Sequence, residues 1–239
     1  MEPGNLDLAR ELSGLLTLAR YGQSFCKPSK RVLLKARHER GPRMFEPAEI
    51  RKMLDGANPA LRAMILLGVN CGFGPSDLAR LPIKATDLKA GWIDFPRPKA
   101  GVHRRCPLWP ETSKAIRSYR ASRREPTDTQ YADRLFITKH GGPFAKDEVS
   151  DNGIVGGEFL RLVVRLGLHR HGLGIYTLRH VFETVAGDSR DQVAVDFIMG
   201  HSRDDMASVY RERISDDRLR AVVEHVRKWL FAAKEHEVG

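Results

Sequence analysis

The sequence predicts a mainly α-helical fold with one small antiparallel β-sheet packed at its edge. Apolar residues recur at helical spacing in most segments, for example along residues 219–230. Strand-like sequence is concentrated at Trp92–Phe95 and Val102–Leu108, which flank the turn PRPKAG. With 41% hydrophobic and 29% charged residues among 239, the chain is globular and long enough to bury a substantial core.

The N-terminal part of the chain combines a short helix with a basic linker. Residues 5–20 place leucines on one helical face, which ends at Tyr21-Gly22. Residues 27–43 hold seven Lys or Arg and a single acid, Glu39. They therefore form either a solvated connector or a linker that lies along a phosphate backbone. The candidate DNA-binding residues in this linker are Lys30, Arg31 and Lys35.

Three helices are predicted between residues 45 and 80. Pro47 suits a first helical turn, and Ile50 and Met53 begin the buried stripe of that helix. Pro59–Cys71 is rich in Leu, Ile and Met, so we expect it to be buried on most sides. The sequence CGFGPSDL at 71–78 then forms a turn that leads into a third, short helix.

The hairpin around PRPKAG is strongly basic. It carries Arg97, Lys99, Arg104 and Arg105 with no acid between them. Because such a cluster can neutralise phosphates, Arg97, Arg104 and Arg105 are candidate DNA-binding residues. A solvated hairpin is the alternative.

The remaining elements are helical apart from one short strand. A helix with a basic face covers 110–124, a polar loop follows, and 135–138 forms a short buried strand or its remnant. A longer helix covers 147–166, although glycines weaken its first half. Ser215 caps a final helix, whose apolar stripe either packs in the core or docks onto a neighbouring protomer.

The charge balance points to a polyanionic partner. The chain has 40 Lys and Arg against 30 Asp and Glu, a formal net charge of +10. This balance favours nucleic acid as the partner and gives no indication of a small-molecule substrate. A generic soluble basic protein is the alternative.

Nothing in the sequence indicates export, a membrane span or a metal site. The N-terminus lacks a basic n-region and an apolar h-region, and the longest apolar run, residues 63–73, is too short to span a bilayer. The three cysteines are far apart, and His169 and His171 have no further ligand at suitable spacing. We therefore expect a cytoplasmic protein with reduced thiols and no metal.

Residues 175–214 carry the candidate catalytic side chains. They place Arg179, His201 and Tyr210 in order, within segments predicted to be helices joined by short turns. A guanidinium can clamp the nonbridging oxygens of a phosphate, an imidazole can move a proton, and a phenol can become a covalent nucleophile. Each residue alone is common in a structural role, so it is the combination that indicates attack on a phosphodiester.

The motifs in this stretch resemble those of a known family. TLRH at 177–180, MGHS at 199–202 and Tyr210 stand in the order of the tyrosine recombinase, or phage integrase, signature. The resemblance implies the family's catalytic-domain fold, helical with a small sheet. It also implies DNA strand cleavage through a 3′-phosphotyrosine, with no metal or nucleotide cofactor because the phosphotyrosine conserves the bond energy.

The resemblance also assigns roles to single residues. Tyr210 is the matching nucleophile, Arg179 the phosphate clamp, and His201 a proton-transfer group. His180 supports the site through a hydrogen bond. Lys99 matches the hairpin lysine that reaches the leaving oxygen of the scissile phosphate.

Partners and domains follow from the same resemblance. The expected partner is double-stranded DNA, on which the chain self-associates as a tetramer. Residues 1–26 are expected to be the remnant of an N-terminal helical DNA-binding domain, 27–44 a basic linker and 45–239 the catalytic domain.

Two positions depart from the family pattern. The first box usually reads TGLRxSEL, and here Gly74 occupies the place of its arginine. Tyr176 replaces the histidine that opens the second box. Loss of one preorganised donor typically costs about 100- to 1000-fold in rate. Either the amides of a helix that begins at Pro75, or Arg97, Arg104 or Arg105 from the hairpin, could compensate.

Three functions remain open from the sequence. The first is an active site-specific recombinase or integrase. The second is a catalytically weak or silent DNA-binding relative with an accessory or regulatory role, which the loss of the first-box arginine favours. The third is a DNA-relaxing, topoisomerase-like enzyme with the same tyrosine chemistry.

Overall fold

The computed structural model describes residues 44–98, 101–145, 153–201 and 213–232, together with Ser29 and Arg31. The chain divides into two compact units, Met1–Pro42 and Arg43–Gly239, and nearly all described residues lie in the second. The predicted helix at 5–20 and most of the predicted linker, including Lys30 and Lys35, lie outside the described residues. Arg31 is exposed.

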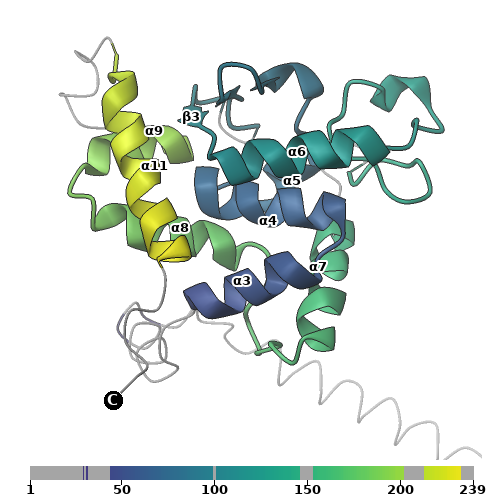
Figure 1. Ribbon diagram of the computed structural model, residues 1–239, viewed down its shortest axis with the longest axis horizontal. Helices are drawn as coiled ribbons and strands as arrows, with labels where there is room; N and C mark the ends of the chain where they lie inside the picture. Colours follow the sequence, from purple (N-terminus) through teal and green to yellow (C-terminus); the bar gives the residue numbers. More distant parts are fainter. Residues whose placement is uncertain are drawn as a thin grey trace, which may run out of the picture. The chain divides into compact units, whose positions relative to one another are not determined.

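The predicted mainly helical fold with a small antiparallel sheet is confirmed. Helix α4 (Pro59–Cys71) lies at the centre and packs against α3 (Pro47–Gly56), α6 (Pro110–Ser122), α8 (Thr177–Gly187) and α11 (Asp216–Phe231), as Figure 1 shows. Ten of its residues are buried, so the prediction that this helix is enclosed on most sides is also confirmed. The other α-helices among the described residues are α5 (Pro75–Arg80), α7 (Gly153–Arg165) and α9 (Gln192–Met199).

Local sequence signals set where the central helices begin. Pro47, Pro59, Pro75 and Pro110 each stand in the first turn of a helix, where a missing N–H costs nothing. The side chain of Asn58 also accepts a hydrogen bond from the amide of Leu61 at 2.9 Å. These starts therefore agree closely with the sequence pattern.

The sheet has three short strands in the order β1-β2-β3, all antiparallel. Strand β1 (Thr86–Asp87) pairs with β2 (Trp92–Asp94), which pairs with β3 (Arg105–Pro107) so that Ile93 stands opposite Cys106. The two predicted strands are present but shorter than expected, and β1 was not predicted. Backbone pairing continues towards the hairpin tip, where the amide of Arg97 donates to the carbonyl of Val102 at 2.9 Å.

Two predicted features differ in detail. Residues 135–137 are buried, but the segment 135–138 forms no strand. Ile137 makes an isolated bridge with Pro143, and Arg134, just before the segment, makes one with Pro82. Ser215 stands at the N-cap of α11 as predicted, yet its side chain makes no capping hydrogen bond. The apolar stripe of α11 packs into the core of its own chain.

An ion pair links α11 to α6. The guanidinium of Arg227 donates to both carboxylate oxygens of Glu111, at 2.7 and 3.0 Å, and this bond is the main reason that the pKa of Glu111 is lowered. The pair therefore stabilises the fold above the ordinary glutamate pKa of about 4.3, and this stability is lost as the pH falls through the lowered value.

We expect Glu111→Gln to lower the free energy of unfolding by about 0.5 kcal/mol at pH 7, the usual size for a partly exposed pair. Chemical unfolding from pH 7 to pH 3 checks the sign, because the gap to wild type should close as Glu111 becomes protonated. Glu183→Gln, an exposed substitution on α8, is the control. A gap that stays constant with pH would show that the pair does not act through charge.

No helix in the described part of the chain is both long enough and apolar enough to cross a membrane.

Candidate active site

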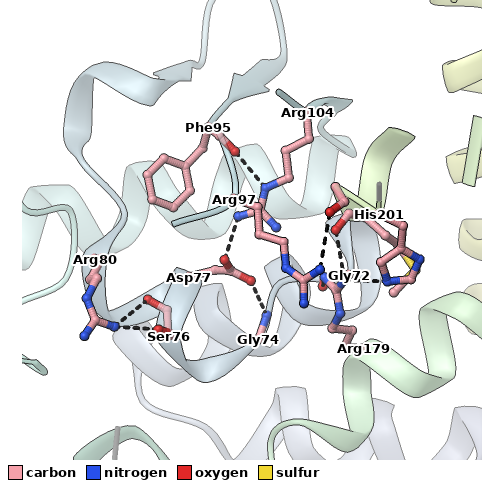
Figure 2. Close-up of polar contacts among 12 residues, drawn as sticks. Gly72, Gly74, Ser76, Asp77, Arg80, Phe95, Arg97, Arg104, Arg179 and His201 are labelled. Atoms are coloured by element: carbon pink, nitrogen blue, oxygen red, sulfur yellow. Dashed lines mark hydrogen bonds and ion pairs between the residues drawn. The ribbon is translucent and has the colours of Figure 1, made fainter. Parts of the chain in front are cut away.

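The guanidinium of Arg179 is buried between the ends of two helices. Only 3% of this residue is exposed. One terminal nitrogen donates to the carbonyl of Gly72 at 2.6 Å and the other to the carbonyl of Met199 at 2.9 Å (Figure 2). No carboxylate is bonded to this guanidinium within the described residues, so backbone carbonyls hold a buried positive charge.

The two helix ends explain how that charge is tolerated. Helices α4 and α9 are each followed by a C-cap glycine, Gly72 and Gly200, whose φ angles of 64° and 63° lie in the left-handed region that glycine adopts readily. The last carbonyls of a helix have no partner within it and carry its negative dipole end. Arg179 satisfies one carbonyl from each end. Burial, and then the charge of Arg97, lower the pKa of Arg179, but a guanidinium stays protonated at neutral pH.

His201 contacts Arg179 directly. Its Nε2 lies 2.9 Å from a terminal nitrogen of Arg179, and its Nδ1 lies 3.7 Å from a carboxylate oxygen of Asp196. Because a guanidinium can only donate, Nε2 accepts this bond and the proton of the ring lies on Nδ1. The backbone amide of His201 donates to the carbonyl of Asp196 at 2.9 Å, which fixes the residue at the end of α9.

A second buried arginine, Arg104, forms one wall of the site. It donates to Asp77 at 2.8 Å and to the carbonyl of Phe95 at 2.7 Å, and its guanidinium stacks 4.1 Å from the ring centre of Phe73. Asp77 also accepts the amide of Gly74 at 2.8 Å. Arg104 is 1% exposed, and one of its terminal nitrogens is buried with no hydrogen-bond partner among the described residues.

Arg97 and Arg105 leave the hairpin in different directions. Arg97 is half-buried and donates to the carbonyl of Gly200 at 3.3 Å. Its guanidinium approaches that of Arg179 in Figure 2. Arg105 pairs with Asp216 of α11 at 2.6 Å and stacks 3.8 Å from Trp92, because side chains alternate between the two faces of a strand. Arg97 and Arg104 therefore belong to the site, whereas Arg105 is engaged with α11.

The tight contact of Gly200 with this cluster gives a stability prediction. A Cβ at Gly200 would lie 3.1 Å from the Cβ of Arg97 and 3.2 Å from the Cδ of Arg104, and φ is positive. We expect Gly200→Ala to lower the free energy of unfolding by about 1–3 kcal/mol, measured by urea unfolding. Gly156→Ala, where nothing lies within 4 Å, should be neutral or stabilising. Equal effects at both positions would contradict the predicted contact.

Comparison with known proteins decides the family. Residues 43–216 match the phage integrase family. The chain belongs to that family. The predicted resemblance is therefore confirmed over most of the chain. The comparison with curated proteins gave no match.

Solved structures of recombinases share the fold. XerA recombinase is 20% identical with a TM-score of 0.57, over 78% of this chain and 65% of its own. The Tn1549 transposon integrase in complex with circular intermediate DNA is 22% identical with a TM-score of 0.55, over 76% and 64%. XerH site-specific recombinase bound to difH substrate is 19% identical with a TM-score of 0.55, over 75% and 52%. The chain thus spans less than two thirds of these proteins.

The two positions that depart from the phage integrase pattern are neighbours in space. A Cβ at Gly74 would lie 3.4 Å from the ring of Tyr176, which is an ordinary contact. Tyr176 is 46% exposed, and its ring packs edge-on against that of His180 with centroids 5.0 Å apart. His180 is exposed and contacts Tyr176 rather than Arg179.

The structure brings together only some of the residues expected for a phage integrase. Arg179, His201, Arg97 and Arg104 lie in one cluster, with Gly74 and Tyr176 at its edge. Lys99 and Tyr210 lie outside the described residues. Across the described residues, no group of three His, Cys, Asp or Glu is arranged to hold a metal ion.

Sequence reasoning missed the partners that hold the arginines. The carbonyls of Gly72 and Met199 and the carboxylate of Asp77 were given no role. A signal existed for Gly72, because a glycine that directly follows a helical pattern is a typical C-cap. No comparable signal in the sequence marks the contacts of Arg179 with Gly72, which lies 107 positions away along the chain, and with Met199, which lies 20 positions away.

Proposed function

We propose that the chain is a site-specific DNA recombinase that cuts and rejoins DNA through a phosphotyrosine at Tyr210. The observation that carries the proposal is the direct contact of Arg179 with His201, at 2.9 Å, in a cluster of arginines. Family membership gives the expected chemistry, and Tyr210 follows His201 by nine positions. A protein that only binds DNA has no need for the phenol of Tyr210.

The proposed reaction needs no cofactor. The hydroxyl oxygen of Tyr210 attacks the scissile phosphorus, the bond from phosphorus to the 5′ oxygen breaks, and the DNA becomes linked through its 3′ phosphate. His201 and Lys99 assist the two proton transfers, from the phenol and to the leaving 5′ oxygen. The 5′-hydroxyl of a partner strand then reverses these steps, so the number of phosphoester bonds is conserved.

Arg179 has the donors that this reaction requires. Its contacts use three of its five N–H groups, since it bonds Gly72, Met199 and His201. The remaining two can donate to nonbridging oxygens of the phosphate. A charge already held in place by protein dipoles does not have to reorganise as the pentavalent phosphate forms.

The remaining site assignments belong to the same proposal. Tyr176 donates a hydrogen bond to phosphate, and His180 supports it through the edge-on ring contact. Arg97 and Arg105 of the hairpin and the linker residues Lys30, Arg31 and Lys35 contact double-stranded DNA, on which the protein forms a tetramer. Arg104 is 1% exposed and paired with Asp77, so it supports the hairpin from within.

Covalent trapping on a pool of DNA sequences tests the proposal and finds the target site in the same experiment. Nicked duplexes with a randomised central sequence are incubated with the protein, because loss of the short strand beyond the nick prevents religation. Wild type should yield a denaturation-resistant adduct that is absent for Tyr210→Phe, and sequencing of the trapped DNA gives the site. Adducts that lack any sequence preference would instead support a topoisomerase-like enzyme.

A silent DNA-binding protein is the second candidate, and Gly74 favours it because a first-box guanidinium is missing. It predicts sequence-selective binding of the duplex pool with no adduct at all.

A further inference from the structure

We propose that Arg97 supplies the second guanidinium that the first box lacks, binding the scissile phosphate together with Arg179. This inference rests on the proposed function, since it assigns a catalytic residue to that reaction.

The two arginines are bound to successive carbonyls of one turn. Arg179 donates to the carbonyl of Met199 and Arg97 to that of Gly200. The aliphatic stem of Arg97 packs closely against Gly200: a Cβ added to Gly200 would lie 3.1 Å from the Cβ and 3.5 Å from the Cδ of Arg97. His201 follows immediately and contacts Arg179. Residues 199–201 therefore bind both guanidiniums through two backbone carbonyls and supply the imidazole beside them.

The cluster has an excess of positive charge that an anion would balance. Arg104 is paired with Asp77, whereas Arg97 and Arg179 are bonded to backbone carbonyls and to no carboxylate within the described residues. Two like charges in a partly buried site repel each other, and an anion bound between them offsets this repulsion. Repulsion by Arg97 indeed contributes to the lowered pKa of Arg179. A phosphodiester has the required charge and two nonbridging oxygens to accept from both.

Arg97 has the freedom and the support that this role needs. Its hydrogen bond to Gly200 is long, at 3.3 Å, and uses one of five N–H groups. Its backbone is fixed, because its amide donates to Val102 at 2.9 Å and its carbonyl accepts from Gly101 at 2.8 Å. The residue is only half-buried, so DNA can reach it.

The other candidates are already occupied. Arg104 is 1% exposed and bonded to both Asp77 and Phe95, so it cannot turn towards a phosphate without breaking a buried ion pair. Arg105 is paired with Asp216. The amide of Gly74 is bonded to the carboxylate of Asp77, which also places a negative charge at the start of α5. Of the three hairpin arginines, Arg97 is therefore the one that can turn to a phosphate.

Two measurements test the assignment, one of them independent of DNA cleavage. In the first, sulfate is titrated against the protein and the increase in melting temperature gives its affinity. We expect Arg97→Ala to weaken saturable sulfate binding by about 10-fold or more, as for loss of a charged hydrogen bond. Arg51→Ala is a matched control, because Arg51 is also half-buried and bonded to a single carbonyl, that of Leu230.

The second measurement is the rate of adduct formation on the trapped DNA. Arg97→Ala should lower it about 100- to 1000-fold, and Arg51→Ala should not. Adding Gly74→Arg to Arg97→Ala should raise the rate of adduct formation at least about 10-fold above that of Arg97→Ala alone, because it returns a guanidinium to the family position. Residue 74 accepts a side chain, since its φ is −89° and a Cβ would meet only ordinary contacts. A purely structural role of Arg97 would not be rescued in this way.

The two arms separate the inference from the proposed function. If wild type forms adducts, an unchanged rate for Arg97→Ala, or a failure of Gly74→Arg to rescue it, overturns the assignment while the recombinase stands. If wild type forms no adduct, the recombinase proposal fails and the sulfate titration decides. Sulfate binding that depends on Arg97 then supports the paired anion site, and binding that is absent or unaffected overturns it.

Discussion

Replacing Arg179 with alanine is expected to lower the rate of adduct formation by about 1000-fold or more. Removal of a single preorganised donor costs about 100- to 1000-fold, and this substitution removes a whole guanidinium. It also leaves the carbonyls of Gly72 and Met199, at the ends of α4 and α9, without their donor. We therefore expect a fall of about 1–3 kcal/mol in the free energy of unfolding as well.

Arg179→Lys separates the two effects. A lysine keeps the charge, but its single nitrogen cannot satisfy both carbonyls and a phosphate in a planar geometry. Its rate should stay close to that of Arg179→Ala while part of the stability returns. Both rates are measured well below the melting temperatures and with DNA binding monitored in parallel. Near wild-type cleavage by Arg179→Ala would exclude Arg179 as the phosphate clamp.

Replacing Arg104 with methionine is expected to destabilise the fold by roughly 3–5 kcal/mol. Methionine keeps an unbranched stem of similar length but removes the guanidinium, which stacks on Phe73 and Phe95, so both the charge and this stacking are lost. The carboxylate of Asp77, whose side chain is 8% exposed, is then buried without its partner. Urea unfolding at pH 7 measures the change.

A double-mutant cycle tests whether the cause is the unpaired charge. Asp77→Asn alone should also be destabilising, because it leaves the guanidinium of Arg104 uncompensated. The combination of Arg104→Met with Asp77→Asn contains no buried charge at this place, and asparagine can still accept the amide of Gly74. We expect the double variant to be more stable than either single variant. Additive losses would mean that the two residues do not act as a pair.

Much of the fold could be predicted from the sequence because its signals are local. A proline in the first turn marks the start of α3, α4, α5 and α6, and apolar spacing marks their buried faces. Strand β1 could not be predicted in this way, since its two residues, Thr86 and Asp87, show no strand pattern in the sequence and form a strand through their pairing with β2. The segment 135–138 is more apolar than β1, but it has no neighbouring strand among the described residues and forms only an isolated bridge, Ile137 with Pro143.

The sequence predicts which residues form the site better than it predicts the hydrogen bonds and ion pairs between them. The family motifs identify Arg179 and His201, and the structure places them in contact. Adjacent arginines at 104 and 105 have the same sequence signal, yet one is buried against Asp77 and the other pairs with Asp216. Strand alternation predicts that they diverge, but only the tertiary partners determine which of them joins the site. Convergence of Lys99 and Tyr210 on this cluster stays a prediction.

The most direct measurement is the identity of the residue that carries DNA in the trapped adduct. The adduct is digested with nuclease and protease, and the modified peptide is sequenced by mass spectrometry. We predict a nucleotide linked through its 3′ phosphate to Tyr210. A nucleotide attached to any other residue, or a 5′ linkage, would contradict the proposed phosphotyrosine chemistry.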